Sequence, residues 1–328
     1  MTNVTHWVGA TLQSTTDLTP TVRELVIQSD AGPALGYDSG AHLQFQLLVN
    51  GRPQVRSYSL IGPPDTQAYR VAVKRLDDGR GGSRAMWALV PGARLQISAP
   101  QNHFALDLSA PAYLLVAGGI GITPLVGMAQ RLASHCAKTG ASLRMVYGAR
   151  SAGELAYLGT LREALGQRVQ AFVTGQGEPV NFAAEIAALP AGGQLYTCGP
   201  VPMLETVKRA WAQAQRPLSD LRFETFGSSG RYAAQAFTVH IPRQHLSITV
   251  PADTSLLDAL EQAGVQTLSD CRRGECGLCA MEVLAVDGVI DHRDVFLSEH
   301  EKHSGQRICA CVSRAVGSVT LDSAYRAD

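Results

Sequence analysis

Three of the seven cysteines in this chain fall within a stretch of nine residues, in the segment DCRRGECGLCAMEVL. Cys271, Cys276 and Cys279 have the spacing C-x4-C-x2-C, with Gly274 and Gly277 between them. Because so little chain separates the three thiols, they share one loop, and glycine permits the close backbone approach that a tight loop needs. An odd number of cysteines concentrated near the C-terminus differs from the evenly spread disulfide framework of a secreted protein. The segment therefore indicates metal binding or redox chemistry.

Length and charge narrow the class of protein. A chain of 328 residues is long enough for two or three domains. Its 28 basic residues balance its 28 acidic ones, whereas nucleic-acid-binding proteins usually carry a marked basic excess. The N-terminus lacks a basic stretch followed by an apolar run, and no apolar run long enough to span a membrane is present. We therefore expect a cytoplasmic protein that binds neither nucleic acid nor membranes.

The hydrophobic pattern changes twice along the chain. Residues 1–107 contain short runs of alternating apolar and polar positions, such as TVRELVI and AHLQFQLLV, and so predict a small antiparallel β-barrel or sandwich, of which we expect the barrel. Residues 108–227 alternate apolar strands with helical stretches, which predicts an α/β domain with a parallel sheet covered on both faces. Residues 228–235 lie in the Gly- and Ser-rich stretch FETFGSSGRYAAQ and are the expected linker. Residues 236–328 form the third expected domain, with a hairpin over AFTVHI and LSITV and a helix over SLLDALEQAG.

The cysteine spacing resembles the ligand pattern of plant-type [2Fe-2S] ferredoxins, in which a distant fourth cysteine completes the set. The tail RICACVSRAVGSVTL offers both Cys309 and Cys311. The length of the gap favours Cys309, whereas the strand that follows places Cys311 at the ligand position. We expect Cys311, because a loop absorbs a change of length more easily than a strand absorbs a change of register. The resemblance implies an α+β β-grasp domain with the metal ligands Cys271, Cys276, Cys279 and Cys311.

Two segments of the first domain resemble flavin-binding elements. RSYSL, beginning at Arg56, resembles the R-x-Y-S element of ferredoxin-reductase-type barrels, whose Tyr packs on the flavin ring, whose Ser lies near N5 and whose Arg pairs with phosphate. VAVKRLDDGRGGS places a strand before a Gly-rich turn that ends at Ser83, where successive amides and a hydroxyl can bind the flavin phosphate. Either segment alone also fits an ordinary strand or hairpin turn. The implied flavin-binding residues here are Arg56, Ser57, Tyr58, Ser59, Val73, Lys74, Arg75, Gly81, Gly82 and Ser83.

Two segments of the second domain resemble the nicotinamide-binding elements of the same reductases. AGGIGITP follows a strand and opens a helix, so its glycines let a pyrophosphate approach the helix N-terminus. YTCGP resembles the second element, whose Cys198 lies near the nicotinamide carbon; an ordinary buried thiol is the alternative for Cys198. Phe226 resembles the aromatic residue that shields the flavin, and Thr123 lies between flavin and nicotinamide. The implied NAD-binding residues are Gly118, Gly119, Gly121, Cys198, Gly199 and Pro200, and the implied catalytic residues are Ser59, Thr123 and Cys198.

The order of flavin barrel, nicotinamide domain and C-terminal ferredoxin resembles the phthalate dioxygenase reductase family over nearly the whole chain. In related reductases with an N-terminal ferredoxin the flavin is FAD, whereas the C-terminal arrangement goes with FMN, so the implied cofactors are FMN, NADH and a [2Fe-2S] cluster. Arg150 follows a strand where the adenosine ribose could lie and could accept the 2′-phosphate of NADPH. The resemblance nevertheless favours NADH.

The resemblance implies an NADH-dependent flavin and iron–sulfur oxidoreductase that supplies a multicomponent Rieske-type aromatic-ring oxygenase. NADH gives up two electrons as a hydride, whereas the cluster accepts one electron at a time, and a flavin between them reconciles the two. Arg272, Arg273 and Glu275 are candidates for the surface that docks the oxygenase, and His292 to Asp294 are expected in a solvated loop. The alternatives are a different acceptor, such as a diiron monooxygenase or a cytochrome, and a zinc-stabilised interaction protein with a nucleotide-binding domain.

Overall fold

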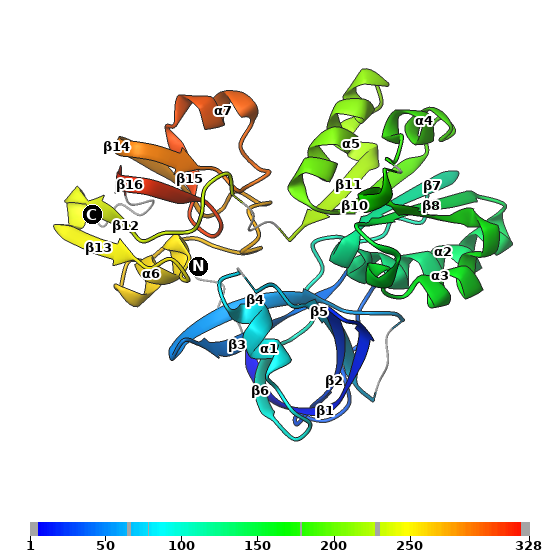
Figure 1. The fold of residues 1–328 in the computed structure, drawn as a ribbon, viewed down its shortest axis with the longest axis horizontal. Coiled ribbons are helices and arrows are strands. Elements are labelled where there is room, and N and C mark those ends of the chain that lie inside the picture. Colours follow the sequence, from blue (N-terminus) through cyan, green and yellow to red (C-terminus); the bar gives the residue numbers. More distant parts are fainter. Residues whose placement is uncertain (1–5, 64–66, 78, 178, 227–229, 323–328) are drawn as a thin grey trace. The chain divides into compact units, whose positions relative to one another are not determined.

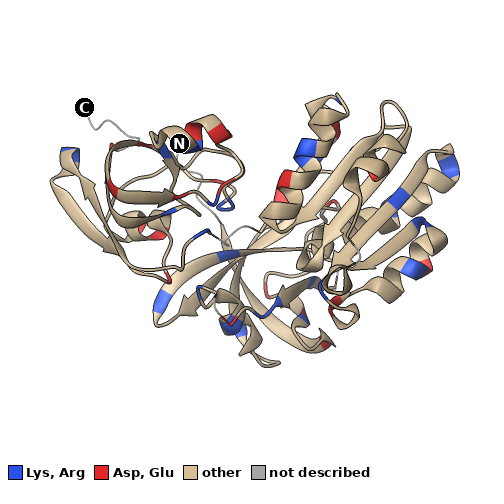
Figure 2. Cartoon of the chain, turned by 45° about the horizontal axis from the view of Figure 1, so that its top comes forward, with Lys and Arg blue, Asp and Glu red and all other residues tan. Residues whose placement is uncertain are grey.

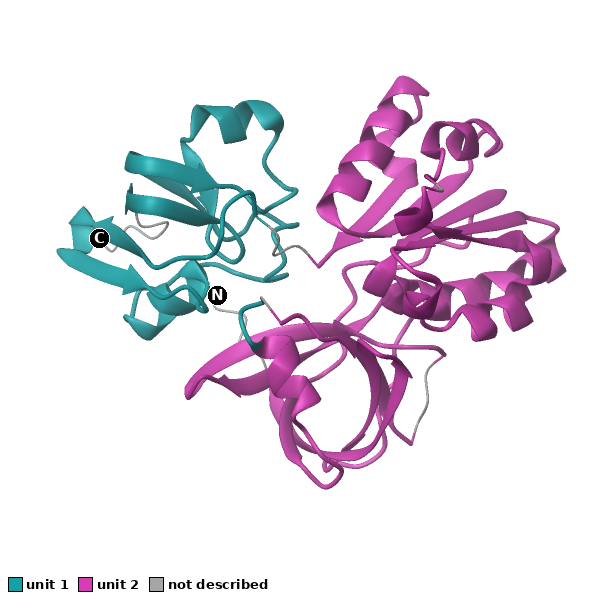
Figure 3. Cartoon of the chain, in the orientation of Figure 1, with its two compact units in different colours: residues 1–4, 78–81, 227–328 teal, residues 5–77, 82–226 magenta. Residues whose placement is uncertain are grey.

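The structure, a computed structural model, describes residues 6–63, 67–77, 79–177, 179–226 and 230–322. The chain divides into two compact units (Figure 3): unit 1 comprises residues 1–4, 78–81 and 227–328, and unit 2 comprises residues 5–77 and 82–226. Unit 2 contains two β-sheets and unit 1 contains one (Figure 1).

The first sheet of unit 2 is antiparallel and has the strand order β4-β3-β6-β1-β2-β5. Its elements are β1 (Trp7–Thr19), β2 (Val22–Ser29), β3 (His42–Val49), β4 (Arg52–Ser59), β5 (Tyr69–Lys74), α1 (Gly82–Trp87) and β6 (Arg94–Ser98). Alternate side chains such as Leu43 and Phe45 point into one core, as the alternating pattern predicts. A bridge between Leu60 and Val71 joins the sheet's two edges, and Met86 of α1 is fully buried in the same core. The predicted antiparallel β-barrel is confirmed.

The second sheet of unit 2 is parallel and has the order β11-β10-β7-β8-β9. Its strands are β7 (Ala112–Gly118), β8 (Ser142–Ala149), β9 (Val169–Val173), β10 (Gln194–Gly199) and β11 (Leu221–Thr225). Its helices are α2 (Thr123–Thr139), α3 (Leu158–Leu165), α4 (Phe182–Ala187) and α5 (Val201–Gln213), with short 3-10 turns η1 (Gly119–Ile122), η2 (Ala152–Glu154), η3 (Gly166–Arg168), η4 (Thr174–Gln176) and η5 (Leu218–Asp220).

Both faces of this parallel sheet are covered. Tyr113 and Leu115 of β7 pack in one core with residues of α2 and α3, whereas Leu114 and Val116 pack in another with residues of α4 and α5. Burial on both faces is why β7 is apolar at nearly every position. The strand order reverses between β7 and β10, and in such sheets ligands bind beyond the carboxyl ends of the strands at this point.

The sheet of unit 1 is mixed, in the order β13-β12-β16-β14-β15, with β12 and β16 parallel and the other pairs antiparallel. The elements of the unit are β12 (Phe237–Ile241), η6 (Pro242–Gln244), β13 (Leu246–Val250), α6 (Leu256–Gln262), β14 (Ala280–Asp291), α7 (Glu299–Ser304), β15 (Arg307–Cys309) and β16 (Arg314–Leu321). Ser255 caps α6 by accepting the N–H of Asp258 at 3.0 Å. Leu256, Leu257 and Leu260 of α6 pack in the core of this sheet, which confirms the predicted α+β domain.

Two long intervals in which the described residues form no strand separate the three sheets along the chain, and the domain boundaries at 107/108, 227/228 and 235/236 stay predictions. β6 ends at Ser98 and β7 begins at Ala112; β11 ends at Thr225 and β12 begins at Phe237. Residues 228 and 229 of the predicted linker lie outside the described residues.

Lys and Arg are interspersed with Asp and Glu along both units (Figure 2). None of the helices that the structure describes has the length and apolar character needed to cross a membrane.

Candidate functional site

The four predicted cluster ligands lie on two neighbouring segments of unit 1. Cys271, Cys276 and Cys279 lie on the irregular segment between α6 and β14, and Cys311 lies in the turn between β15 and β16. The Sγ atoms of Cys279 and Cys311 are 3.2 Å apart. The turn is held because the N–H groups of Val312 and Ser313 both donate to the carbonyl of Cys309, at 3.3 and 3.0 Å.

Backbone amides converge on the first of these sulfurs. The N–H groups of Arg273, Glu275 and Cys276 each lie 3.4 Å from Cys271 Sγ. Such convergence needs unusual backbone angles, and φ is positive at Arg272 (52°) and Gly274 (77°). These donors stabilise negative charge on sulfur, so the loop suits an anionic iron–sulfur cluster.

Both its surroundings and its backbone conformation require glycine at residue 277. A Cβ there would lie 2.2 Å from the ring of Phe296, and φ at this residue is 74°. The loop therefore closes against Phe296 only with glycine at this position.

Cys311 and Cys309 have different sulfur neighbours, and Cys311 stays the predicted fourth ligand. Cys311 interacts with both Cys271 and Cys279, whereas Cys309, on β15, interacts with Cys279. Hydrogen bonds from Cys309 and Cys311 lower the pKa of Cys279 to about 4, and those from Cys276 and Cys311 hold the pKa of Cys271 far below its ordinary value. Thiolates are the form that binds metal. No three His, Cys, Asp or Glu side chains of the described residues are arranged to hold one ion together.

Arg272 and Arg273 of the cluster loop form ion pairs inside unit 1. Arg272 pairs with Asp258 at 2.9 Å and with Glu261 at 2.5 Å. Arg273 is 7% exposed and lies 3.4 Å from Glu275. Both arginines therefore have partners within unit 1, and a docking role for Arg272, Arg273 and Glu275 stays a prediction.

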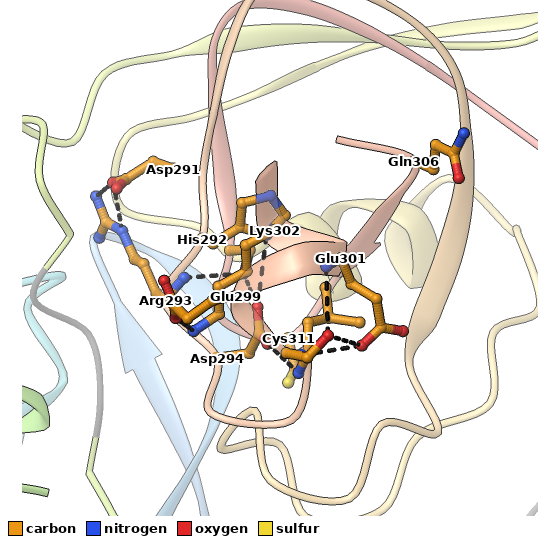
Figure 4. A network of polar contacts seen from close by, with 12 residues as sticks. Asp291, His292, Arg293, Asp294, Glu299, Glu301, Lys302, Gln306 and Cys311 are labelled. Atoms are coloured by element: carbon orange, nitrogen blue, oxygen red, sulfur yellow. Dashed lines mark hydrogen bonds and ion pairs between the residues drawn. The ribbon is translucent and has the colours of Figure 1, made fainter. Parts of the chain in front are cut away.

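The expectation of a solvated loop at residues 292–294 is wrong. Arg293 and Asp294 are buried, with exposed fractions of 7% and 1%. His292 lies 3.7 Å from Asp294, and Asp294 accepts hydrogen bonds from Ser313 Oγ and from the N–H of Leu297 (Figure 4). Burial alone would raise the pKa of Asp294, but His292 and these hydrogen bonds hold it below its ordinary value.

The two predicted flavin segments meet in unit 2. Arg56 on β4 lies against the first residue of α1, since a Cβ on Gly82 would be 2.7 Å from Arg56 Nε. Tyr58 packs edge-on against Phe45, with ring centroids 5.5 Å apart, and burial raises its pKa. The Ser83 hydroxyl accepts the N–H of Leu76 at 3.1 Å. Arg56 therefore lies beside the turn that contains Gly82.

The cations predicted near the flavin phosphate have other partners. Lys74 pairs with Glu154 at 3.1 Å, and Arg75 lies 3.4 Å from Asp77 with its guanidinium over the ring of Trp87. Val73 is buried in the barrel core, so its side chain is structural.

Tight packing joins the two predicted nicotinamide segments at the carboxyl ends of β7 and β10. A Cβ on Gly121 would lie 2.2 Å from the carbonyl oxygen of Cys198, and one on Gly118 would lie 2.8 Å from Pro200. A Cβ on Gly199 would lie 3.1 Å from the Cα of Gly118. Gly119 differs, because its φ of 53° places it in the left-handed region with open space where a Cβ would project. Backbone thus approaches backbone here as closely as glycine allows.

Sequence reasoning missed one residue of this region, Glu224. It is 1% exposed on β11, opposite Cys198 in the parallel pairing of β10 and β11. The Ser59 hydroxyl, from β4 of the barrel, lies 3.5 Å from Glu224 Oε2. Ser59 therefore lies next to a buried carboxylate, and Cys198 is the backbone neighbour of that glutamate in the sheet. A glutamate inside the apolar strand LRFETF was the signal that could have found it.

The remaining predicted residues lie around the same region. The Thr123 hydroxyl, at the start of α2, donates to the carbonyl of Ile120 at 3.0 Å. Phe226 follows β11 and packs on the core shared by the barrel and α2. Arg150 is exposed at the end of β8, and its carbonyl accepts the N–H of Gly175.

Comparison with known families agrees with this architecture. Family models match an oxidoreductase FAD-binding domain over residues 9–106, an oxidoreductase NAD-binding domain over residues 115–209 and a 2Fe-2S iron-sulfur cluster binding domain over residues 239–316. The chain is therefore an oxidoreductase with domains for a flavin, NAD and a [2Fe-2S] cluster, as predicted. The alternative zinc site is not supported.

Similar proteins cover nearly the whole chain. The phenoxybenzoate dioxygenase subunit beta of Ectopseudomonas oleovorans is 40% identical over 87% of this chain and 88% of its own. The heme-dependent oxidative N-demethylase beta subunit of Ectopseudomonas mendocina is 38% identical over 93% of this chain and 95% of its own. The solved structure of phthalate dioxygenase reductase, described as modular for electron transfer from pyridine nucleotides to [2Fe-2S], is 30% identical with a TM-score of 0.81 and covers 96% of this chain and 98% of its own. This chain belongs to the family of phthalate dioxygenase reductase.

Proposed function

We propose that this protein is the reductase component of a multicomponent Rieske-type oxygenase that acts on an aromatic compound, and that it works in the cytoplasm. The observation that carries the proposal is the presence of flavin, NAD and [2Fe-2S] domains in one chain, together with a 40% identical relative named as a dioxygenase subunit. When bound, a flavin accepts the hydride of NADH and releases single electrons, and an iron–sulfur cluster accepts and passes on single electrons. The terminal oxygenase is the electron acceptor.

The flavin that we propose is FMN. Arg56 lies beside the Gly-rich turn at Gly82, where a terminal phosphate would bind, and its Nη1 donates to the carbonyl of Val55 at 2.8 Å. Lys74 and Arg75 have carboxylate partners. The C-terminal position of the cluster domain, which goes with FMN in the resembled family, supports the same choice. Release of the flavin by heat and chromatography against FMN and FAD standards tests it.

For hydride transfer, the chain's own residues align the donor and acceptor rings. Gly118, Gly119 and Gly121, with Cys198, Gly199 and Pro200, would hold NADH at the carboxyl ends of β7 and β10, and Thr123 would lie between the two rings. The buried pair Ser59 and Glu224 would orient polar groups there, since its carboxylate is shielded from water. NADH is the proposed donor, with Arg150 the position at which a preference for NADPH would be read.

For electron exit, we propose Cys271, Cys276, Cys279 and Cys311 as ligands. The amides of Arg273, Glu275 and Cys276 stabilise charge at Cys271, and Cys276 is the exposed member of the set. An exposed ligand gives an acceptor a short path to the cluster.

A second acceptor, a haem enzyme, is supported by the 38% identical subunit of a heme-dependent N-demethylase. Purified protein supplied with NADH and either a Rieske oxygenase or a haem oxygenase separates the two candidates. Product formed in proportion to NADH consumed with the Rieske enzyme supports the proposal. Coupled turnover with the haem enzyme alone would contradict the Rieske assignment and leave the reductase assignment intact.

A further inference from the structure

The outer face of the barrel is covered where β2 and β5 meet the NAD-binding domain. Leu25 of β2 and Val71 of β5 point into the barrel core. The alternate residues Val22 and Ala72 point the opposite way and are buried in the core that contains Leu115 of β7. The barrel and the parallel sheet therefore share apolar packing along one face of these two strands, inside unit 2.

Two polar contacts lie beside this apolar packing. Glu24 and Lys74 each lie two residues further along their strand than a buried residue of the packed face, and so belong to the same face. The Tyr157 hydroxyl donates to Glu24 Oε2 at 2.8 Å. Lys74 Nζ lies 3.1 Å from Glu154 Oε1. Glu154 and Tyr157 both belong to the segment between β8 and α3, and we call these two contacts the latch.

Tyr157 has a strained backbone. Its φ of 60° and ψ of 8° place it in the left-handed region, at the residue before α3. That region is unfavourable for a residue with a side chain, and such strain persists only where the surrounding structure holds it. The carbonyl of Tyr157 accepts the N–H of Leu161 at 2.9 Å, and its hydroxyl bonds Glu24. The strained residue is therefore fastened to α3 on one side and to the barrel on the other.

The hydroxyl of Tyr157 is a permanent donor at neutral pH. Burial and the neighbouring Glu24 carboxylate raise the pKa of Tyr157, so the hydroxyl stays protonated. The side chain of Glu24 is 13% exposed, and its other oxygen lies 3.6 Å from Arg70 Nη1. The carboxylate thus faces a hydroxyl and a guanidinium largely out of solvent, where charge-assisted hydrogen bonds are strong.

The segment that carries the latch begins beside the proposed NAD site. β8 pairs in parallel with β7, and Gly148 lies opposite Gly118. Two residues later, the Arg150 carbonyl accepts the N–H of Gly175 at 3.1 Å, and a Cβ on Gly175 would lie 2.3 Å from that oxygen. The start of the segment 150–157 is therefore held by the NAD-binding domain itself, whereas its end is held by the barrel.

We propose that the latch aligns the NAD-binding domain with the barrel for hydride transfer, with Glu24 and Tyr157 as positioning residues; this inference rests on the proposed function. In that step NADH loses a hydride and becomes NAD⁺, and the bound flavin gains the hydride with its two electrons. Reacting atoms must lie about 3–3.5 Å apart, and a misplacement of about 1 Å can cost about a hundredfold in rate. Loss of the latch should therefore slow hydride transfer without weakening the binding of NADH, since Arg150 keeps its own support.

The test is anaerobic stopped-flow mixing of the holoprotein with NADH, which separates the limiting rate of flavin reduction from the dissociation constant of NADH. Tyr157→Phe removes one oxygen atom, and Glu24→Ala removes the acceptor. Both should lower the limiting rate about tenfold and change the dissociation constant less than about twofold. Glu24→Gln keeps an acceptor oxygen for Tyr157 and should retain more than about half of the wild-type rate.

Two controls make comparable changes within the parallel-sheet part of unit 2. Tyr113→Phe removes a hydroxyl that accepts the N–H of Ala110 at 3.0 Å. Glu185→Gln breaks a pair with Arg144 at 2.8 Å. Neither contact crosses to the barrel, so both variants should keep the wild-type limiting rate. Flavin content, the visible spectrum and the urea midpoint establish that each variant is folded and loaded. Reduction by dithionite, which needs no bound nicotinamide, should proceed at the wild-type rate in every variant.

The outcomes separate alignment from a general loss of structure. A limiting rate lowered about tenfold in Tyr157→Phe and Glu24→Ala, with NADH affinity and dithionite reduction unchanged, supports the inference. Wild-type limiting rates in these two variants overturn it. An equal loss in Tyr113→Phe or Glu24→Gln, or slower reduction by dithionite as well, also overturns it, because the effect would then not come from the latch. A wild-type flavin that NADH does not reduce instead overturns the proposed function.

Discussion

The cluster loop of unit 1 and the predicted NAD site of unit 2, at the carboxyl ends of β7 and β10, are built by opposite means. The cluster loop is held by charged side chains, with Arg272 paired to Asp258 and Glu261 and a buried Asp291–Arg293 pair below it. The predicted NAD site depends on residues that lack side chains, because Gly118, Gly121 and Gly199 allow the ends of β7 and β10 to come into backbone contact.

The difference follows from what each site must present. An iron–sulfur cluster is bound by cysteine sulfurs, so the proposed ligands need fixed directions, and ion pairs on the loop help to fix them. A dinucleotide is bound largely by backbone at the end of a strand, so the predicted NAD site needs few side chains, which lets the dinucleotide approach the backbone closely. Substitutions should therefore damage the first site by removing partners and the second by adding atoms.

The largest effect should come from removing a sulfur. Cys311→Ser should abolish the cluster, seen as loss of its visible absorption and of iron and acid-labile sulfide, because serine offers no thiolate. Cys309→Ser is the matched control and should keep the cluster. The opposite pattern would make Cys309 the ligand.

At the predicted NAD site, one added methyl group should be enough to disturb the packing. Gly121→Ala should lower the free energy of unfolding of unit 2 by about 3 kcal/mol and weaken NADH binding, because its Cβ would meet the backbone of Cys198 at 2.2 Å. Urea unfolding and the KM for NADH measure the two effects. Gly148→Ala on β8 is the control, since its Cβ would lie 3.7 Å from its nearest neighbour. Equal effects of the two changes would remove close packing as the explanation.

Loss of the ion pairs of Arg272 should destabilise the cluster loop. Arg272→Gln should lower the free energy of unfolding of unit 1 by about 2 kcal/mol, because Asp258 and Glu261 lose their charged donor. Cluster bleaching in urea should occur at lower denaturant. Arg243→Gln, which breaks a pair in which the arginine is half exposed, should change the midpoint little. A midpoint for Arg272→Gln equal to that of wild type would show that the pairs do not hold the loop.

The smallest effect concerns acid. The pKa of Asp294 is lowered in the folded state, so its carboxylate stabilises unit 1 above the ordinary aspartate pKa of 3.8, and this contribution is lost as pH falls through the lower folded value. Asp294→Asn should therefore cost about 1 kcal/mol at neutral pH and less below about pH 4. Far-ultraviolet circular dichroism during urea unfolding at several pH values measures this. A pH-independent difference would show that the charge of Asp294 does not contribute.

The sequence predicted what depends on local pattern. Alternation in the first hundred residues and the strand–helix order after Ala112 were enough for the two sheets of unit 2, because hydrophobic period follows from which faces are buried. The α+β fold of unit 1 was implied by the ferredoxin resemblance. The resemblance carried by the cysteine spacing and the Gly-rich segments led to the correct family. Hydrogen-bonding sequence neighbours such as Ser255 and Asp258 were likewise predictable.

What the sequence did not predict depends on partners distant in the chain. From sequence alone Arg293 was expected in a solvated loop, but in the structure it contacts Asp291 and the backbone of Tyr232. Arg272 was expected at the surface, but it pairs with two carboxylates of α6. Glu224 was missed because Ser59, its neighbour in space, lies 165 positions away. Burial of a charge is a tertiary property, so no local pattern announces it.

The central claim is that NADH reduces an iron–sulfur cluster in this chain only by way of a bound flavin. Electron paramagnetic resonance of anaerobic protein after addition of NADH tests this directly, with a flavin-depleted sample beside the holoprotein and iron and sulfide measured in both. We expect a reduced-cluster signal in the holoprotein and none without flavin. Absence of iron and sulfide from the holoprotein, or an equally rapid signal without flavin, would contradict the account.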